Sequence, residues 1–138
     1  MLRAATQRDF AFLRPFSTGP DDEKLRTQIR DGRLRIIETT GEPVGFIKFY
    51  ILWEVLPFME VIMVSEDRRR CGIGRDAVRS WEREMAARSF RRTLTSTQAD
   101  ETAQEFWRRI GYRECGSITL PGQPAELFLF HDIGDGHA

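Results

Sequence analysis

Residues 66–78 read EDRRRCGIGRDAV, and this stretch decides how the rest of the chain is interpreted. Three arginines lead into Cys71, Gly72, Ile73 and Gly74, and a helix is predicted to begin there. The arrangement does not favour stability, because glycine inside a helix costs about 1 kcal/mol relative to alanine and adjacent like charges repel. The pattern therefore indicates that something negatively charged binds at this point.

A glycine-rich loop in front of a helix is a general device for binding phosphate. The first amides of a helix have no intrahelical partner and lie at the positive end of its dipole. Glycine lacks the Cβ atom that would keep an anion away from those amides. Arginine adds charge and donates forked hydrogen bonds to phosphate oxygens. The sequence therefore predicts a phosphate-binding loop.

Two common phosphate motifs do not fit this loop. A Walker loop needs Gly-Lys-Ser/Thr, which is absent. Residues 72–77 satisfy the dinucleotide pattern G-x-G-x-x-A, but the preceding strands are joined by hairpin-like turns instead of a βαβ unit. The acid expected about 20 residues further on is also missing, because residues 90–93 are Phe-Arg-Arg-Thr. A nicotinamide cofactor is therefore disfavoured.

Composition predicts one globular domain over residues 1–138, with a frayed tail at 134–138. The net charge is zero, with 21 basic and 21 acidic residues, so general attraction to nucleic acid is not expected. No stretch approaches the length of a membrane span, and the first residues, MLRAATQRDF, lack a signal-peptide core. Two cysteines give neither a disulfide framework nor a metal site, which favours a cytoplasmic setting.

Periodicity and capping signals predict the element order β-α-α-β-β-β-α-β-α-β-β. The strand at 58–64 is apolar except for Glu60 and is expected to be buried on both faces. The expected strands are 2–5, two strands flanking a turn at 40–43, then 58–64, 93–98, 112–120 and 126–133, and the expected helices are 6–13, 21–31, 73–89 and 100–110.

These features resemble a known family. The run from Arg69 to Gly74 resembles the R/Q-x-x-G-x-G/A signature of the GCN5-related N-acetyltransferases, the GNAT superfamily. Residues 103–112, Ala-x-x-Phe-Trp-x-x-x-Gly-Tyr, resemble its second motif. The similarity covers almost the whole chain and is strongest over 58–113. It implies a single-domain α+β fold with a mixed, mostly antiparallel, splayed sheet of six to seven strands and about four helices on both faces.

The resemblance implies acetyl-CoA, or another acyl-CoA, as a cosubstrate, and no metal. In the family the pyrophosphate lies on the loop amides, and the pantetheine arm pairs with the end of the fourth strand like an added strand. Asp100 stands where the family often has an asparagine that contacts the cofactor, although a helix cap is the favoured explanation. The implied cofactor-binding residues are Ile62, Met63, Val64, Arg69, Arg70, Cys71, Gly72, Ile73, Gly74, Arg75, Asp100 and Trp107.

Glu60 is the candidate catalytic base. It is the one charge in the apolar strand, and burial would raise its pKa so that it could accept a proton through a water. The alternative is a buried glutamate paired with an arginine or a backbone donor. Trp107 stands where family members often have a tyrosine that acts as general acid, and an indole cannot supply a proton at neutral pH. Tyr112 is expected in the core.

The other reactive residues have structural explanations. The Cys71 side chain is expected to point away from the phosphate, Cys115 to lie in the core, and His131 to be structural. The acceptor is expected near residues 14–30 and 51–58, where acids and aromatics suit a cationic amine. Surface acids and core aromatics explain the same residues.

The sequence therefore predicts an N-acetyltransferase. It would transfer an acetyl group from acetyl-CoA to a primary amine, either a small molecule or a protein amino group, by direct attack in a ternary complex. The alternative is a non-catalytic acyl-CoA-binding sensor or regulatory module. Nucleic-acid and membrane partners are not expected, and a homodimer is common among similar proteins.

Overall fold

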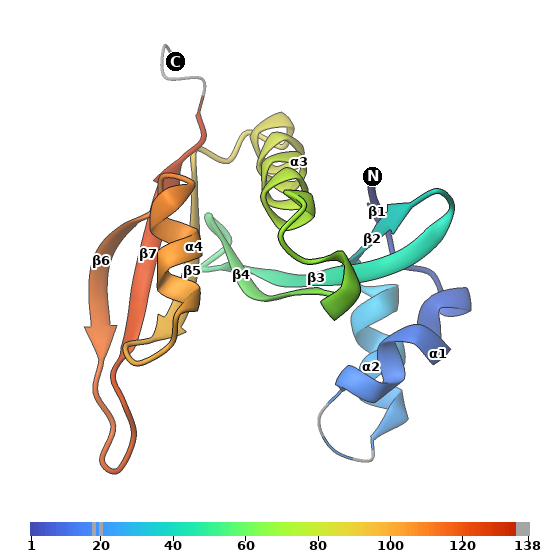
Figure 1. Ribbon diagram of the computed structural model, residues 1–138, viewed down its shortest axis with the longest axis horizontal. Helices are drawn as coiled ribbons and strands as arrows, with labels where there is room; N and C mark the ends of the chain where they lie inside the picture. Colours follow the sequence, from blue (N-terminus) through green and yellow to red (C-terminus); the bar gives the residue numbers. More distant parts are fainter. Residues whose placement is uncertain (18, 20, 135–138) are drawn as a thin grey trace. The chain divides into compact units, whose positions relative to one another are not determined.

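The computed structural model describes every residue except 18, 20 and 135–138 (Figure 1). Short 3₁₀ turns at Gln7–Asp9, Arg14–Phe16 and Glu66–Arg68 flank the longer elements. The strands are β1 (Leu2–Ala4), β2 (Leu34–Thr39), β3 (Glu42–Leu52), β4 (Leu56–Val64), β5 (Arg92–Gln98), β6 (Arg113–Ile118) and β7 (Glu126–Asp132), and the helices are α1 (Phe10–Leu13), α2 (Asp22–Arg30), α3 (Ile73–Ala87) and α4 (Ala103–Arg109).

The strands form a seven-stranded sheet in the order β1-β2-β3-β4-β5-β7-β6. The pairs β1–β2, β2–β3, β5–β7 and β6–β7 are antiparallel. Strands β4 and β5 are parallel, with Phe58 opposite Leu94 and Met59 opposite Thr95. The predicted mixed, mostly antiparallel sheet is therefore confirmed.

The chain divides into two compact units, and each is described by itself below. The first comprises Met1–Phe49 and Val61–Trp81, and the second comprises Tyr50–Glu60 and Glu82–Ala138. The single domain predicted over 1–138 stays a prediction.

In the first unit, helices lie on both faces of the strands (Figure 1). Phe46 of β3 belongs to an apolar cluster with Leu13 and Leu25, which come from the two N-terminal helices. Phe49 stacks on Trp81 of α3, with ring centroids 5.6 Å apart. Because successive residues of a strand point to opposite faces, α1 and α2 cover one face of β3 and the start of α3 covers the other.

In the second unit, β5 lies between β4 and β7. The Thr95 hydroxyl donates to the Met59 carbonyl at 3.0 Å. Leu129 of β7 is fully buried opposite Thr95, and β6 forms the exposed edge of the sheet. Helix α4 packs against β5.

Two side-chain caps stabilise the N-terminal helical segments. Thr6 and Asp9 form a capping box, in which the Thr6 amide donates to the Asp9 carboxylate at 2.8 Å. Asp21 caps α2 by accepting from the amides of Glu23 and Lys24. Both caps depend on residues three positions apart or fewer, so the local sequence decides them.

Other expectations were wrong. Helix α4 begins at Ala103 after Thr102, so Asp100 does not cap it and lies exposed in a turn. The second half of β4 is half-buried instead of buried on both faces. Cys115, expected in the core, is exposed on the edge strand β6. The predicted tail lies outside the described residues apart from Gly134, whose amide donates to Arg91 at 2.9 Å.

Candidate functional site

The glycine loop lies in the first unit, directly before α3. Arg70 and Gly72 both have positive φ angles, 66° and 81°. The Asp76 amide donates to the Gly72 carbonyl at 3.0 Å, which makes Gly72 the residue at the helix start. Alternating left-handed and right-handed residues point successive N–H groups to one side and form an anion-binding concavity. The positive φ angles at Arg70 and Gly72 follow this pattern.

Two of the three loop arginines donate hydrogen bonds to other groups of the protein. Arg68 donates to the Thr39 hydroxyl of β2 at 3.1 Å. Arg69 donates from Nε to the Val64 carbonyl at the end of β4, at 2.8 Å. The Cys71 thiol donates to the carbonyls of Arg68 and Arg69, at 3.2 and 3.3 Å, so its side chain turns back to the loop. These contacts hold the loop in shape.

Arg70 and Arg75 are placed differently from Arg68 and Arg69. Arg70 is exposed, and Arg75 is exposed next to Asp76, 3.4 Å from its carboxylate. Gly72 sits close to Arg75, since a Cβ on Gly72 would lie 3.3 Å from the Arg75 guanidinium. Arg70 and Arg75 are therefore the cations able to contact an anion on the loop amides.

The end of β4 reaches unusually close to β3. The carbonyl oxygen of Met63 occupies the space that a Cβ atom on Gly45 would need. Just beyond, the Ser65 amide donates to the Val44 carbonyl at 2.7 Å. Gly45 thus sets the backbone of Met63 and Val64, two of the residues predicted to contact the cosubstrate. The sequence interpretation missed Gly45, although an isolated glycine inside a strand signals close backbone approach.

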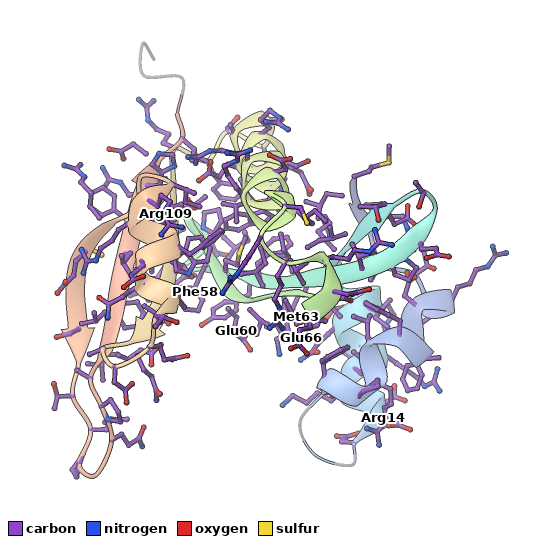
Figure 2. The ribbon with its side chains drawn as sticks, viewed as in Figure 1. Arg14, Phe58, Glu60, Met63, Glu66 and Arg109 are labelled. Atoms are coloured by element: carbon purple, nitrogen blue, oxygen red, sulfur yellow. The ribbon has the colours of Figure 1, made fainter. Side chains whose placement is uncertain are left out.

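Glu60 belongs to the second unit and lies on β4 (Figure 2). Its neighbours Phe58 and Met59 are buried, and Phe58 stacks on Tyr50 and Phe128 with centroids 5.3 and 6.0 Å away. Glu60 itself is exposed. The prediction that this carboxylate is buried is therefore wrong. Its role as a base stays a prediction, which rests on the position of Glu60 in β4.

Trp107 and Tyr112 are core residues of the second unit. Trp107 is 4% exposed, and its ring contacts Phe106 and Tyr112 with centroids 5.2 and 4.8 Å away. The Tyr112 hydroxyl donates to the Glu82 carboxylate at 2.7 Å and pairs with the Thr93 hydroxyl at 2.8 Å. Tyr112 therefore has a structural role, as expected.

His131 completes this buried network. Its Nδ1 lies 2.8 Å from the same Glu82 oxygen that Tyr112 contacts. The network joins α3, β5, β7 and the residue before β6 around one carboxylate. This placement agrees with the structural role expected for His131.

Two of the acids predicted near the acceptor have partners within the protein. Asp21 caps α2, and Asp22 forms an ion pair with Arg14, which Figure 2 labels. In the β3–β4 turn, Trp53 and Glu54 are exposed, with φ angles of 53° and 64°.

No helix in the described part of the chain is long and apolar enough to cross a membrane. Within the same part of the chain, no three His, Cys, Asp or Glu side chains gather as metal ligands would.

Comparison with known proteins identifies the family of this chain. The sequence matches the model of the Acetyltransferase (GNAT) family over residues 2–112. The chain belongs to the GNAT family. No curated protein matches the sequence.

Solved structures share the fold across nearly the whole chain. A ribosomal-protein-alanine N-acetyltransferase from Brucella melitensis is 22% identical, with a TM-score of 0.76 over 96% of this chain and 99% of that chain. An aminoglycoside 6'-N-acetyltransferase complexed with coenzyme A is 16% identical, with a TM-score of 0.79 over 96% and 97%. A GNAT family acetyltransferase from Elizabethkingia anophelis with acetyl-CoA bound is 16% identical, with a TM-score of 0.66 over 82% and 84%.

Proposed function

We propose that this protein is an N-acetyltransferase that transfers an acetyl group from acetyl-CoA to a primary amine by direct attack in a ternary complex. The observation that carries the proposal is the loop before α3, where positive φ angles at Arg70 and Gly72 and the open helix start form an anion-binding concavity. Family membership and the CoA-bound structures with the same fold support an acyl-CoA as its ligand.

The first unit would hold the donor. The amides of residues 70–75 bind the pyrophosphate, and the Arg70 and Arg75 guanidiniums add charge to that contact. The half-buried backbone of Ile62, Met63 and Val64 pairs with the pantetheine amides. Arg69 keeps the end of β4 attached to the loop through the Val64 carbonyl. Bound acetyl-CoA supplies an activated thioester carbonyl.

Glu60 would act as the general base. The attacking amine must lose a proton, and the Glu60 carboxylate accepts it through a water while the new C–N bond forms and the C–S bond breaks. Trp107 is buried and carries only an indole N–H, so it cannot return a proton to the thiolate. Water supplies that proton, since a CoA thiolate is a fair leaving group.

One observation favours a second function. Because Trp107 is buried in an aromatic cluster where relatives often have an acidic tyrosine, the fold is also compatible with a non-catalytic acyl-CoA sensor. Both functions require acyl-CoA binding, but only the enzyme would release CoA in the presence of an amine.

The test is CoA release from acetyl-CoA with a panel of small amines and peptides bearing a free amino group. We expect CoA release that depends on both the amine and the protein, with one acetylated product. If acetyl-CoA binds but no amine releases CoA, the enzyme assignment is wrong and the sensor remains. If acetyl-CoA does not bind, both fail.

A further inference from the structure

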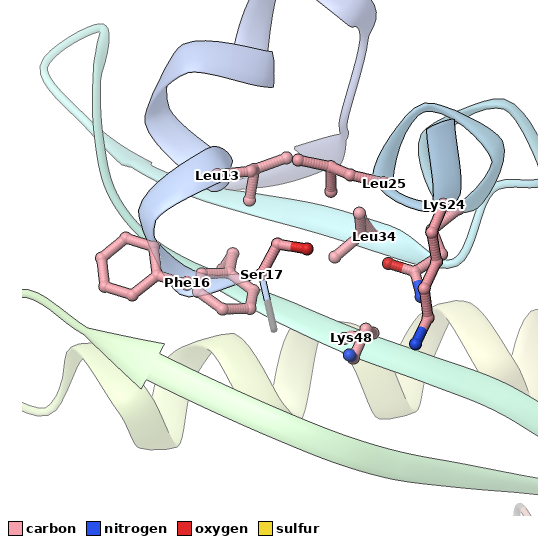
Figure 3. Close-up of a pocket in the computed structure, with 9 residues that line it drawn as sticks. Leu13, Phe16, Ser17, Lys24, Leu25, Leu34 and Lys48 are labelled. Carbon is pink, nitrogen blue, oxygen red and sulfur yellow. The ribbon is translucent and has the colours of Figure 1, made fainter. Parts of the chain in front are cut away.

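Two features outside the glycine loop lie in different units. In the first unit, a pocket of about 30 Å³ opens beside α2 (Figure 3). It has room for about two waters, and Gln28 in its lining is 8% exposed. In the second unit, by contrast, exposed arginines gather at one end of the sheet.

Four strands of the second unit begin or end at this place. Strands β4 and β5 run parallel, with Phe58 opposite Leu94, so the turn before β4 lies at the end where β5 starts. Strand β7 is antiparallel to β5, and Asp132 at its end lies opposite Arg92. Strand β6 is antiparallel to β7 and therefore starts here as well (Figure 1).

Helices α3 and α4 end at the same place. The residues after α4 reach the start of β5, since the Tyr112 hydroxyl lies 2.8 Å from that of Thr93. Figure 2 labels Arg109 at the end of α4, and the loop after α3 leads directly into β5. We refer to this surface as the arginine end; its exposed arginines are Arg88, Arg91, Arg92, Arg108, Arg109 and Arg113.

The arginine end is more positive than its acids can balance. The exposed acids among its described residues are Glu54, Glu114 and Asp132. Arg92 pairs with Asp132 at 2.7 Å, and Arg108 pairs with Glu114 at 2.9 Å. Within the described part of the chain, no ion pair involves Arg88, Arg91, Arg109 or Arg113. The zero net charge of the whole chain is therefore compatible with a local site for a polyanion.

Helix dipoles account for only part of this charge. Arg108 and Arg109 lie in the last turn of α4, where a cation is favourable. Arg91, Arg92 and Arg113 lie just before or at the starts of β5 and β6, where no helix end selects them. These three arginines favour an anionic partner.

Aromatic rings support several of the guanidinium groups. Arg92 and Arg113 both lie over the Phe130 ring, 4.9 and 5.0 Å from its centroid. Arg88 lies over Phe90 at 5.4 Å. Stacking occupies the face of a guanidinium group and leaves N–H groups at its edge able to donate. Arginines held in this way are suited to phosphate oxygens, which accept forked hydrogen bonds.

An aromatic side chain is exposed at the same end. Trp53 is 77% exposed, and no ring or cation of the described residues stacks on it. The Val55 amide donates to the Leu52 carbonyl at 3.0 Å, and the two central residues of this turn, Trp53 and Glu54, have positive φ angles. Such turns usually contain Asn-Gly, so a tryptophan is strained here. Strain of this kind is concentrated at functional sites.

These features favour nucleic acid over a lipid surface. Proteins that hold single strands combine cations for the phosphates with aromatic rings on which bases stack. A lipid surface would require several apolar side chains that insert together. The exposed large apolar residues described at this end are Trp53 and Val55, with the charged Glu54 between them.

We propose that the arginine end binds single-stranded nucleic acid, with Arg91 and Arg113 on its phosphates and Trp53 stacked on a base. All three residues belong to the second unit, whereas the glycine loop belongs to the first. The proposal does not depend on the proposed function, because the nucleic acid binds without acetyl transfer.

The first measurement is the salt dependence of binding. Fluorescence anisotropy follows a labelled oligoadenylate RNA of about 20 nucleotides. If the four arginines without an acid partner each contact one phosphate, the slope of log K against log salt is about −0.7 per contact, or about −2.8. We expect affinity to fall about 50-fold between 50 mM and 200 mM salt. No binding at 50 mM salt, or binding that salt does not weaken, would overturn the proposal.

A charge variant and a matched control locate the site. Arg91→Gln/Arg113→Gln removes two exposed cations, so the fold should be retained. Its affinity at 50 mM salt should fall at least about tenfold, and its salt slope should become about 1.4 shallower. The control Arg8→Gln/Arg30→Gln removes two exposed arginines of the first unit and should bind as the parent does. Equal weakening in both variants would reduce the effect to general charge and overturn the proposal.

Trp53→Ala tests the stacked base. It should weaken RNA binding about tenfold and leave the salt slope unchanged, because stacking releases no counterions. Trp53→Phe should recover most of the affinity, since it retains an aromatic ring. Full affinity in Trp53→Ala would contradict the assignment of single-stranded nucleic acid.

Competition separates the arginine end from the glycine loop and from other polyanions. Acetyl-CoA at millimolar concentration should leave RNA bound. Displacement of RNA by acetyl-CoA would place the RNA on the glycine loop and overturn the proposal. Phosphatidylserine vesicles and polyglutamate, at equal charge, should compete poorly. Tighter binding of either than of RNA would make a lipid surface or an acidic protein the partner and contradict the proposal.

Discussion

The carbonyl oxygen of Met63 fills the space above Gly45 that any other residue would give to its Cβ atom. The Met63 carbonyl carbon and the Val64 Cα would each lie 3.1 Å from that atom, so backbone, and not a movable side chain, is in the way. A residue of β3 thereby sets the course of β4 where the cosubstrate is proposed to pair.

Gly45→Ala should therefore weaken acetyl-CoA binding. The added methyl group forces β3 and β4 apart, which costs about 1–3 kcal/mol of stability, and a backbone shift that removes 1.4 kcal/mol of binding free energy weakens binding about tenfold. Isothermal titration with acetyl-CoA measures the effect. Gly116→Ala is the control, because a Cβ at this strand glycine meets nothing within 4 Å. Unchanged affinity in Gly45→Ala would show that the end of β4 does not contact the cosubstrate.

Glu60→Gln should lower kcat by about 100-fold or more, the usual effect of removing a general base. Acetyl-CoA affinity and the melting temperature should stay near the parent values, because Glu60 is exposed. The rate should recover at higher pH, where more of the amine is already neutral. Glu54→Gln, at an exposed acid of the preceding turn, is the control. Equal kcat in parent and Glu60→Gln would remove Glu60 from the mechanism.

Tyr112→Phe should destabilise the fold by about 1–3 kcal/mol, because it removes a donor to a buried carboxylate. Glu82 is 5% exposed and would keep the contact with His131. Urea unfolding measures the loss, and acetyl-CoA affinity and kcat should not change. A kcat that falls 100-fold with stability intact would instead make Tyr112 the general acid.

Asp9 should make stability depend on acidic pH. The hydrogen bond from Arg3, together with the Thr6 amide, holds the pKa of this buried carboxyl below its ordinary value. A depressed folded pKa adds stability that is complete above the unfolded pKa of about 3.9 and is lost as pH falls through the folded pKa. Asp9→Asn should cost about 2 kcal/mol at neutral pH and flatten the acid limb of a plot of melting temperature against pH. Parallel curves for parent and variant would contradict this linkage.

The parts of the fold that follow from local chemistry could be predicted from the sequence. The capping box at Thr6 and Asp9 and the cap at Asp21 depend on neighbours in the chain. The loop at Gly72 could also be predicted from the sequence, because a positive φ before a helix selects glycine.

Features set by contacts between distant segments were missed. Gln28 is predicted on a polar helix, and its burial depends on where β2 and β3 lie. Glu60 was expected to be buried because its strand is apolar, but its exposure depends on the packing around β4. Cys115 was expected in the core because it lies in a strand, but the position of that strand at the sheet edge is a property of topology.

The most direct test of the central claim is the thermal stability of the parent, Gly72→Ala and Gly122→Ala with and without acetyl-CoA. Both glycines have positive φ, 81° and 79°, so alanine adds similar strain at each. A Cβ at Gly122 meets nothing within 4 Å, whereas one at Gly72 would crowd the loop near Arg75. Acetyl-CoA at 100 times its dissociation constant should stabilise the parent and Gly122→Ala by about 2.7 kcal/mol, and Gly72→Ala far less. No stabilisation of the parent at millimolar acetyl-CoA, or full stabilisation of Gly72→Ala, would contradict the assignment of this loop as the acyl-CoA site.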